Sequence, residues 1–101
     1  MKSHLKKNNC YRITIKEINT DNEDSPASLQ FEVQDRENLF AIVDQLKRSS
    51  GLNEQAATQV GVGIRLLGPV MMQDRKHPLF VDFMPYFKTF MQHLKNTIKS
   101  N

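Results

Sequence analysis

The sequence predicts an α+β fold in which a two-stranded antiparallel hairpin precedes three to four helices packed on one face. Apolar and polar residues alternate over Tyr11–Ile15 and again over Leu29–Val33, with the period of a half-buried strand. After Asp35 the apolar spacing changes to three and four residues, which is typical of amphipathic helices. A chain of 101 residues suffices for one core. We therefore expect a flexible lead over residues 1–9 and a single α+β domain over residues 10–101.

The two predicted strands are joined by residues 19–27, a polar and acidic stretch that contains Pro26. This composition predicts a long, mobile loop between antiparallel strands. We expect the hairpin to lay one apolar face on the helices, formed by Tyr11, Ile13, Ile15, Leu29, Phe31 and Val33.

The first predicted helix follows Asp35, a residue type that caps helix N-termini well. Its apolar face comprises Leu39, Ile42, Val43 and Leu46. Lys47 and Arg48 lie near the negative C-terminal end of the helix, and Gly51 is suited to the left-handed stop that follows.

The next segment has two interpretations. Asn53 is a good N-cap, and apolar spacing at three and four residues predicts a helix over Ala56–Leu67. Residues Val60–Leu66 also alternate, and each glycine inside a helix costs about 1 kcal/mol relative to alanine. We favour the helix, with Gly61 or Gly63 at a close contact, and expect Gly68-Pro69 to kink or restart it.

A charged connector over Asp74–Pro78 leads to the last helix through an apolar turn or short helix formed by Leu79, Phe80, Phe83 and Met84. Pro85 fits the first turn of the last helix. Its predicted buried stripe comprises Phe87, Phe90, Met91, Leu94 and Ile98.

Composition and charge restrict the class of protein. Cys10 is the only cysteine, which fits a reducing compartment, and the polar N-terminus lacks the apolar core of a secretory signal. No apolar stretch is long enough to span a membrane, so we expect a cytoplasmic protein. The net charge of +3 divides into +5 over residues 1–16, −6 over 17–54 and +4 over 55–101. Such a division suits complementary halves of one domain or a charged face offered to a partner.

No pattern predicts a catalytic, cofactor-binding or metal-binding residue. The histidines at positions 4, 77 and 93 are far apart, and Cys10 stands alone. Gly61-Val62-Gly63 lacks the remaining residues of a phosphate loop, so helix packing explains it better. The acidic residues of the predicted loop have neither the glycine nor the flanking helices of a calcium loop; they are Asp21, Glu23 and Asp24.

Several segments resemble the DUF3861 family of small uncharacterised bacterial proteins. They are Tyr11-Arg12-Ile13-Thr14, Leu29-Gln30-Phe31-Glu32, Leu39–Val43 and Arg75-Lys76-His77-Pro78-Leu79-Phe80. The resemblance covers most of the chain and implies a bacterial domain with strand-strand-helices order. It supplies no activity and no catalytic residue. Pro69 departs from the helix-compatible residue that the resemblance leads us to expect after Gly68.

The candidate binding surface is Arg75, Lys76 and His77, three potential cations between two apolar stretches. They can bind an anion or an acidic partner, or they can cap the negative end of the preceding helix. His77 can also form a local hydrogen bond that fixes the bend before Pro78. We predict a non-enzymatic interaction module with a protein partner, and a homodimer that protects the hairpin edges. The alternative is a nucleic-acid-binding protein, which would need a basic stripe and exposed aromatics, whereas we expect nearly every aromatic in the core. That stripe would comprise Lys6, Lys7, Arg75, Lys76 and Lys88.

Overall fold

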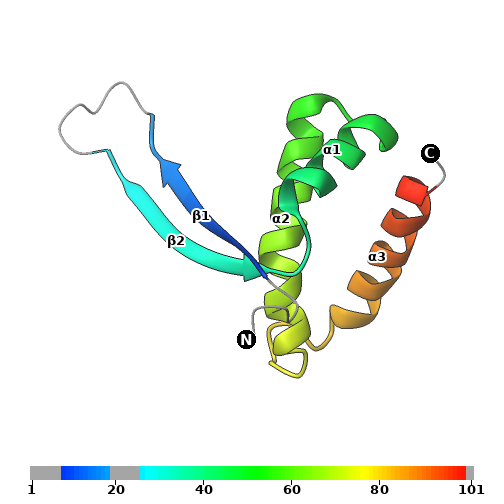
Figure 1. The fold of residues 1–101 in the computed structure, drawn as a ribbon. Helices are drawn as coiled ribbons and strands as arrows, with labels where there is room; N and C mark the ends of the chain where they lie inside the picture. The colour runs from blue at the N-terminus through cyan, green and yellow to red at the C-terminus, as the bar shows by residue number, and fades with distance from the viewer. Residues whose placement is uncertain (1–7, 19–25, 100–101) are drawn as a thin grey trace, which may run out of the picture. The chain divides into compact units, whose positions relative to one another are not determined.

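A computed structural model of the chain describes residues 8–18 and 26–99, and it confirms the predicted α+β class. Two antiparallel strands precede three helices (Figure 1). The elements are β1 (Asn9–Lys16), β2 (Ser28–Asp35), α1 (Leu39–Ser49), α2 (Glu54–Gln73) and α3 (Met84–Lys99). The chain divides into two compact units, the hairpin unit up to Glu37 and the helical unit from Asn38 onward. Residues 1–7 of the predicted lead and residues 19–25 of the predicted loop lie outside the described residues. Asn9, which was predicted to belong to the lead, is the first residue of β1.

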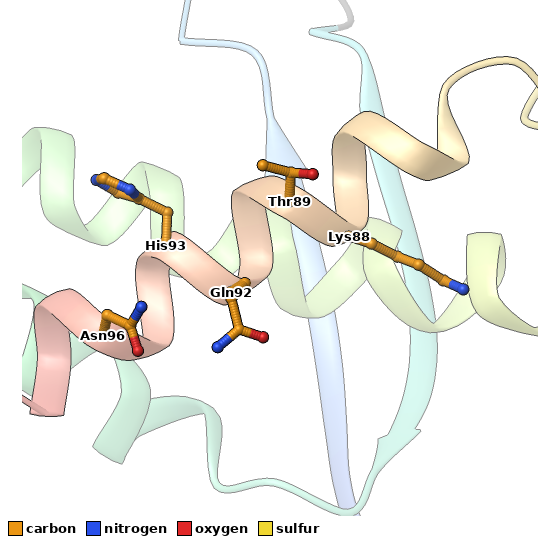
Figure 2. Close-up of a pocket in the computed structure, with 5 residues that line it drawn as sticks. All are labelled: Lys88, Thr89, Gln92, His93 and Asn96. Carbon is orange, nitrogen blue, oxygen red and sulfur yellow. The ribbon is translucent and has the colours of Figure 1, made fainter.

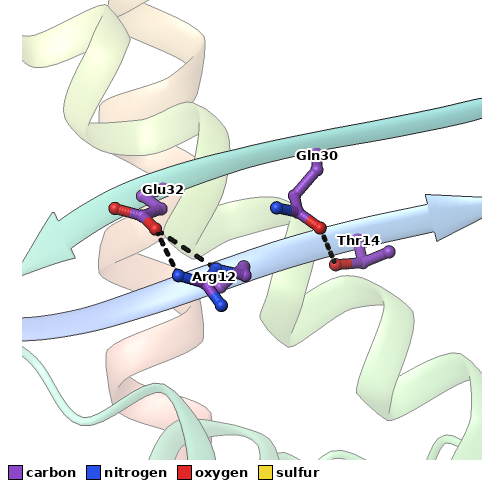
Figure 3. Close-up of polar contacts among 4 residues, drawn as sticks. All are labelled: Arg12, Thr14, Gln30 and Glu32. Atoms are coloured by element: carbon purple, nitrogen blue, oxygen red, sulfur yellow. Dashed lines mark hydrogen bonds and ion pairs between the residues drawn. The ribbon is translucent and has the colours of Figure 1, made fainter.

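The hairpin pairs along its whole length, from Asn9 opposite Asp35 to Lys16 opposite Ser28. Both strands therefore extend beyond the alternating stretches that predicted them. Cross-strand side chains stabilise the polar face: Arg12 lies 2.8 Å from the Glu32 carboxylate, and the Thr14 hydroxyl donates to the Gln30 side-chain oxygen (Figure 3). On the other face, Leu29 is 57% exposed. The packing of this apolar face on the helices stays a prediction.

The prediction that Asp35 caps the first helix is wrong. Asp35 is the last residue of β2, and its carboxylate accepts the backbone N–H of Glu37 at 3.0 Å. The N-cap is Asn38, whose side-chain oxygen accepts the N–H of Ala41 at 3.1 Å. Asp35 forms a local side-chain turn that ends the strand, whereas Asn38 directly precedes the first helical residue.

The contested segment is helical, as favoured from the sequence. Asn53 caps α2 by accepting the N–H of Ala56 at 2.8 Å. A close contact between helices explains the glycine at position 61, because a Cβ atom there would lie 2.9 Å from Cγ2 of Val43. The backbone of α2 thus approaches α1 closely, beside Leu46, which is fully buried. Gly63 makes no such approach.

The helix α2 continues through Pro69, so of the two expected effects the restart is wrong and the kink stays a prediction. Proline inside a helix costs about 3 kcal/mol because it lacks an N–H and clashes with the preceding turn. The last turn of α2 nevertheless carries Met71, which is 1% exposed and packs with Met84 and Phe87 of α3. Burial of Met71 in this cluster offsets the local cost of Pro69.

The last helix buries a narrower stripe than the sequence predicts. Met84 and Phe87 are buried, and Pro85 lies in the first turn as expected. Phe90 was expected in the buried stripe, but it is 47% exposed. At 100° per residue, Phe90 lies about 60° around the helix from Phe87, at the margin of the apolar stripe. Within the described ranges, the helices are too short or too polar to cross a bilayer.

Candidate functional site

In the structure, α2 and α3 are joined by residues 74–83, which include the predicted charged connector and the apolar turn after it. We call this whole segment the connector, and it consists of successive hydrogen-bonded turns. The N–H of Asp74 donates to the carbonyl of Val70 at 3.1 Å and caps α2. The N–H of His77 then donates to the Asp74 carbonyl at 2.9 Å, and the N–H of Phe80 donates to the His77 carbonyl at the same distance. The side chains of the connector are therefore carried on a backbone with defined turns.

His77 has a structural role within the connector, as expected from its position before Pro78. Its Nδ1 atom accepts the N–H of Leu79 at 3.0 Å, which leaves Nε2 as the donor in the neutral ring. Its ring centroid lies 5.6 Å from that of Phe80, at an interplanar angle of 45°. Phe80 in turn packs against the Met71, Met84 and Phe87 cluster. His77 thus fixes the turn and connects it to the core.

Arg75 and Lys76 remain available for an external partner. Both side chains are exposed, and within the described ranges neither forms a hydrogen bond or an ion pair. The end of α2 is capped by the backbone of Asp74. Two carboxylates, Asp74 and Asp82, lie on the same segment and are also exposed. The connector therefore combines separate charges of both signs.

Apolar side chains accompany these cations. Leu79 is 74% exposed, Val81 45% and Phe83 47%. Tyr86, in the first turn of α3, is also largely exposed. The sequence grouped Leu79 and Phe83 with Phe80 and Met84 as one apolar turn, but the structure buries only the second pair, Phe80 in part. No periodic signal separates the two pairs, because consecutive tight turns follow neither the strand nor the helix period.

The expectation that nearly every aromatic belongs to the core is wrong. Phe87 is buried, and Tyr11 and Phe80 are half-buried. The exposed aromatics are Phe31, Phe40, Phe83, Tyr86 and Phe90. Phe40 follows the first residue of α1 and points away from the buried face formed by Leu39 and Leu46.

A shallow depression lies along α3 and was not predicted (Figure 2). Its volume is about 420 Å³, and it is lined by Lys88, Thr89, Gln92, His93 and Asn96. The spacing of these residues places them on one polar face of α3, and that spacing is the sequence signal that could have indicated them. The Thr89 hydroxyl already donates to the carbonyl of Pro85 at 3.1 Å. The depression has polar walls but no convergent set of reactive groups.

The other residues considered from the sequence are not brought together in the described part of the chain. Gly61, Gly63 and Gly68 all lie inside α2, so they form no phosphate loop. Cys10 is an exposed free thiol on β1. Among the described residues, no three histidine, cysteine or acidic side chains are placed to hold a metal ion. The acidic residues at positions 21, 23 and 24 lie outside the described ranges.

These features define a small α+β domain with a hairpin, three helices and an exposed connector. The chain belongs to the DUF3861 family, a domain of unknown function with a solved structure, whose model matches residues 9–96. It is similar to a crystal structure of a protein of unknown function from Pectobacterium atrosepticum, with 34% identity and a TM-score of 0.77. The match covers 88% of this chain and 98% of that one. No curated protein matches the sequence.

Proposed function

We propose that this chain is a non-enzymatic protein-interaction module whose connector, residues 74–83, binds an acidic segment of a partner protein that also carries apolar side chains. The observation that carries the proposal is the combination of two exposed cations, unpaired within the described ranges, with exposed apolar side chains on one short segment. We place the module in the cytoplasm because Cys10 has no second cysteine with which to form an internal disulfide.

Charge supports an acidic partner. Residues 55–101 contain six lysines and arginines and two acidic residues, Asp74 and Asp82. The resulting positive potential accelerates the approach of an acidic chain, an effect that added salt weakens. Within the connector, Arg75 can bind a carboxylate with two parallel N–H donors, whereas Lys76 acts as a point charge.

Exposed apolar area supports a protein rather than a small anion. Burying a leucine side chain contributes about 1.5–3 kcal/mol, and Leu79 is 74% exposed before any partner binds. Val81 and Phe83 extend this apolar area along the same segment. An exposed apolar patch with a polar rim is typical of a protein interaction site.

A direct binding experiment tests the proposal. The probe is a fluorescein-labelled peptide rich in glutamate with interspersed leucines, and binding to the full chain is measured by fluorescence anisotropy. The Arg75→Ala/Lys76→Ala variant should bind about ten-fold more weakly, which corresponds to about 1.4 kcal/mol. The matched control is Lys95→Ala/Lys99→Ala, which removes the same charge from exposed positions on α3. Equal affinity of the connector variant and the parent, or equal losses in both variants, would contradict the proposal.

The exposed aromatics favour a second candidate function, binding of single-stranded nucleic acid. Tyr86 is 71% exposed and lies two residues before Lys88 on α3. Bases stack on exposed aromatic rings, and each stacking contact is worth about 1–3 kcal/mol. The proposed basic stripe also includes Lys6 and Lys7, which lie outside the described residues. Anisotropy with a poly-dT oligonucleotide distinguishes the two functions: this candidate requires binding that falls steeply with salt and weakens in Tyr86→Ala.

A further inference from the structure

The β2 strand has an outer edge with which no other strand pairs in the described part of the chain. All residues from Ser28 to Glu32 are exposed, and of the β1 residues that pair with them only Ile13 is half-buried. An unpaired strand edge presents a row of backbone donors and acceptors that can pair with another strand.

The hydrogen-bonding pattern identifies which β2 residues face this edge. The N–H of Glu17 donates to the carbonyl of Ala27 at 2.9 Å, and these two residues continue the register of the hairpin. Bonded and non-bonded pairs alternate along an antiparallel ladder. Ile13 and Phe31 therefore exchange backbone hydrogen bonds across the hairpin, whereas the backbone N–H and C=O groups of Gln30 and Glu32 point outward.

We infer that two copies of this chain associate through β2, edge to edge, to form a four-stranded antiparallel sheet. Two registers between the paired β2 strands place the apolar side chains of both copies on the same face of the sheet and include nearly the whole strand in the ladder. One is centred on Phe31 and the other on Glu32. The second register sets Glu32 opposite its own copy, and directly opposed like charges are destabilising. The first register is therefore favoured.

In the register centred on Phe31, backbone and side chains both find partners. Gln30 lies opposite Glu32 of the second copy, so outward donors meet outward acceptors. On the apolar face, Leu29 lies opposite Val33 of the second copy, and the two Phe31 rings meet at the symmetry axis. These are non-bonded pairs, in which side chains approach most closely. Leu29 and Phe31, which are 57% and 38% exposed, thereby gain cross-strand apolar contacts.

Charge favours β2 over β1 as the shared edge. The polar face of β1 carries Arg12 and Lys16. Pairing β1 with β1 of a second copy would therefore bring four cations into one ladder. Between Ser28 and Gln34, β2 carries a single charge, Glu32, which is neutralised by Arg12 at 2.8 Å (Figure 3). This inference concerns the hairpin alone and does not depend on what binds the connector.

Two matched proline variants test the inference in light-scattering measurements on the full chain over the micromolar range. Gln30→Pro removes an outward N–H from β2 without removing a hairpin hydrogen bond. Thr14→Pro does the same on β1, directly opposite, and both variants lose the same side-chain hydrogen bond between these residues. The parent and Thr14→Pro should have twice the mass of one chain, and Gln30→Pro the mass of one chain. A monomeric parent, or a dimer sensitive only to Thr14→Pro or to neither change, overturns the inference.

A disulfide test decides the result if both prolines disrupt the hairpin. In a Cys10→Ser background, Phe31→Cys places two thiols at the symmetry axis, within the distance that a disulfide spans. The matched control is Leu29→Cys, whose two copies would lie about four residues apart along the ladder, roughly 13 Å. Oxidation should link Phe31→Cys into a covalent dimer and leave Leu29→Cys unlinked. Equal linking of the two variants, or no linking of Phe31→Cys, overturns the inference.

Discussion

Replacing Gly61 with alanine tests the close approach of α1 and α2. The new Cβ atom would lie 2.9 Å from Cγ2 of Val43 and 3.3 Å from Cδ1 of Leu46. Val43 is β-branched and has little χ1 freedom in a helix, and Leu46 is fully buried, so neither side chain yields easily. Overpacking of this kind costs about 1–3 kcal/mol, against a propensity gain of about 1 kcal/mol for replacing glycine in a helix. We expect Gly61→Ala to lower the free energy of unfolding by up to about 2 kcal/mol.

Urea denaturation of three variants separates sterics from helix propensity. Gly63 lies two residues further along the same helix and has no atom near its would-be Cβ, so Gly63→Ala should stabilise the protein by about 0.5–1 kcal/mol. Val43→Ala removes the atom nearest to the new methyl group. The Val43→Ala/Gly61→Ala double variant should therefore be more stable than the two single effects predict by addition. Stabilisation by Gly61→Ala comparable to that of Gly63→Ala would refute the close-packing argument.

Three further changes test the core, a helix cap and the connector. Phe87→Ala should cost about 3–5 kcal/mol because this side chain is buried, whereas the half-exposed Phe90→Ala should cost much less; equal losses in urea denaturation would place the core wrongly. Asn53→Ala should cost about 1 kcal/mol by the same measurement, while Asn53→Asp keeps a capping oxygen and should be nearly neutral; equal losses would remove the capping role. Leu79→Ala should leave the melting temperature unchanged and weaken binding of the glutamate–leucine peptide; unchanged binding would exclude Leu79 from the interface.

The order and type of the elements could be predicted because hydrophobic periodicity reports them directly. The strand period ends at Val33, within two residues of the end of β2, and the helical spacing continues across α1, α2 and α3. For Val60–Leu66 the two periods competed, and the longer helical face gave the correct answer. The sequence also predicted the Asn53 cap and the left-handed Gly51, which has a φ of 84°. Both depend on local backbone geometry.

The errors arose where contacts distant in sequence decide the outcome. Asp35 and Asn38 are both good capping residues, and choosing between them requires knowing where β2 ends. Pro69 stays inside α2, whose last turn is held by packing of Met71 against α3. The exposure of Phe90 depends on how α3 is rotated about its own axis, which an apolar stripe defines only within a wide arc.

The candidate site was only partly visible in the sequence. Charge and position indicated Arg75, Lys76 and His77, and the sequence also suggested that His77 fixes the turn before Pro78. The apolar side chains of the connector could not be assigned to core or surface, because a run of tight turns has no repeating face. Only the burial seen in the structure separates these side chains: Leu79 is exposed, and Phe80 packs against the core.

The central claim is that the connector is a binding surface, and NMR mapping tests it most directly. The full chain, labelled with ¹⁵N, is titrated with the glutamate–leucine peptide while backbone amide shifts are followed. We expect saturable shifts concentrated over residues 75–83 and absent from the polar depression on α3. Shifts confined to residues 88–96 of α3, or no shifts at saturating peptide, would contradict the claim.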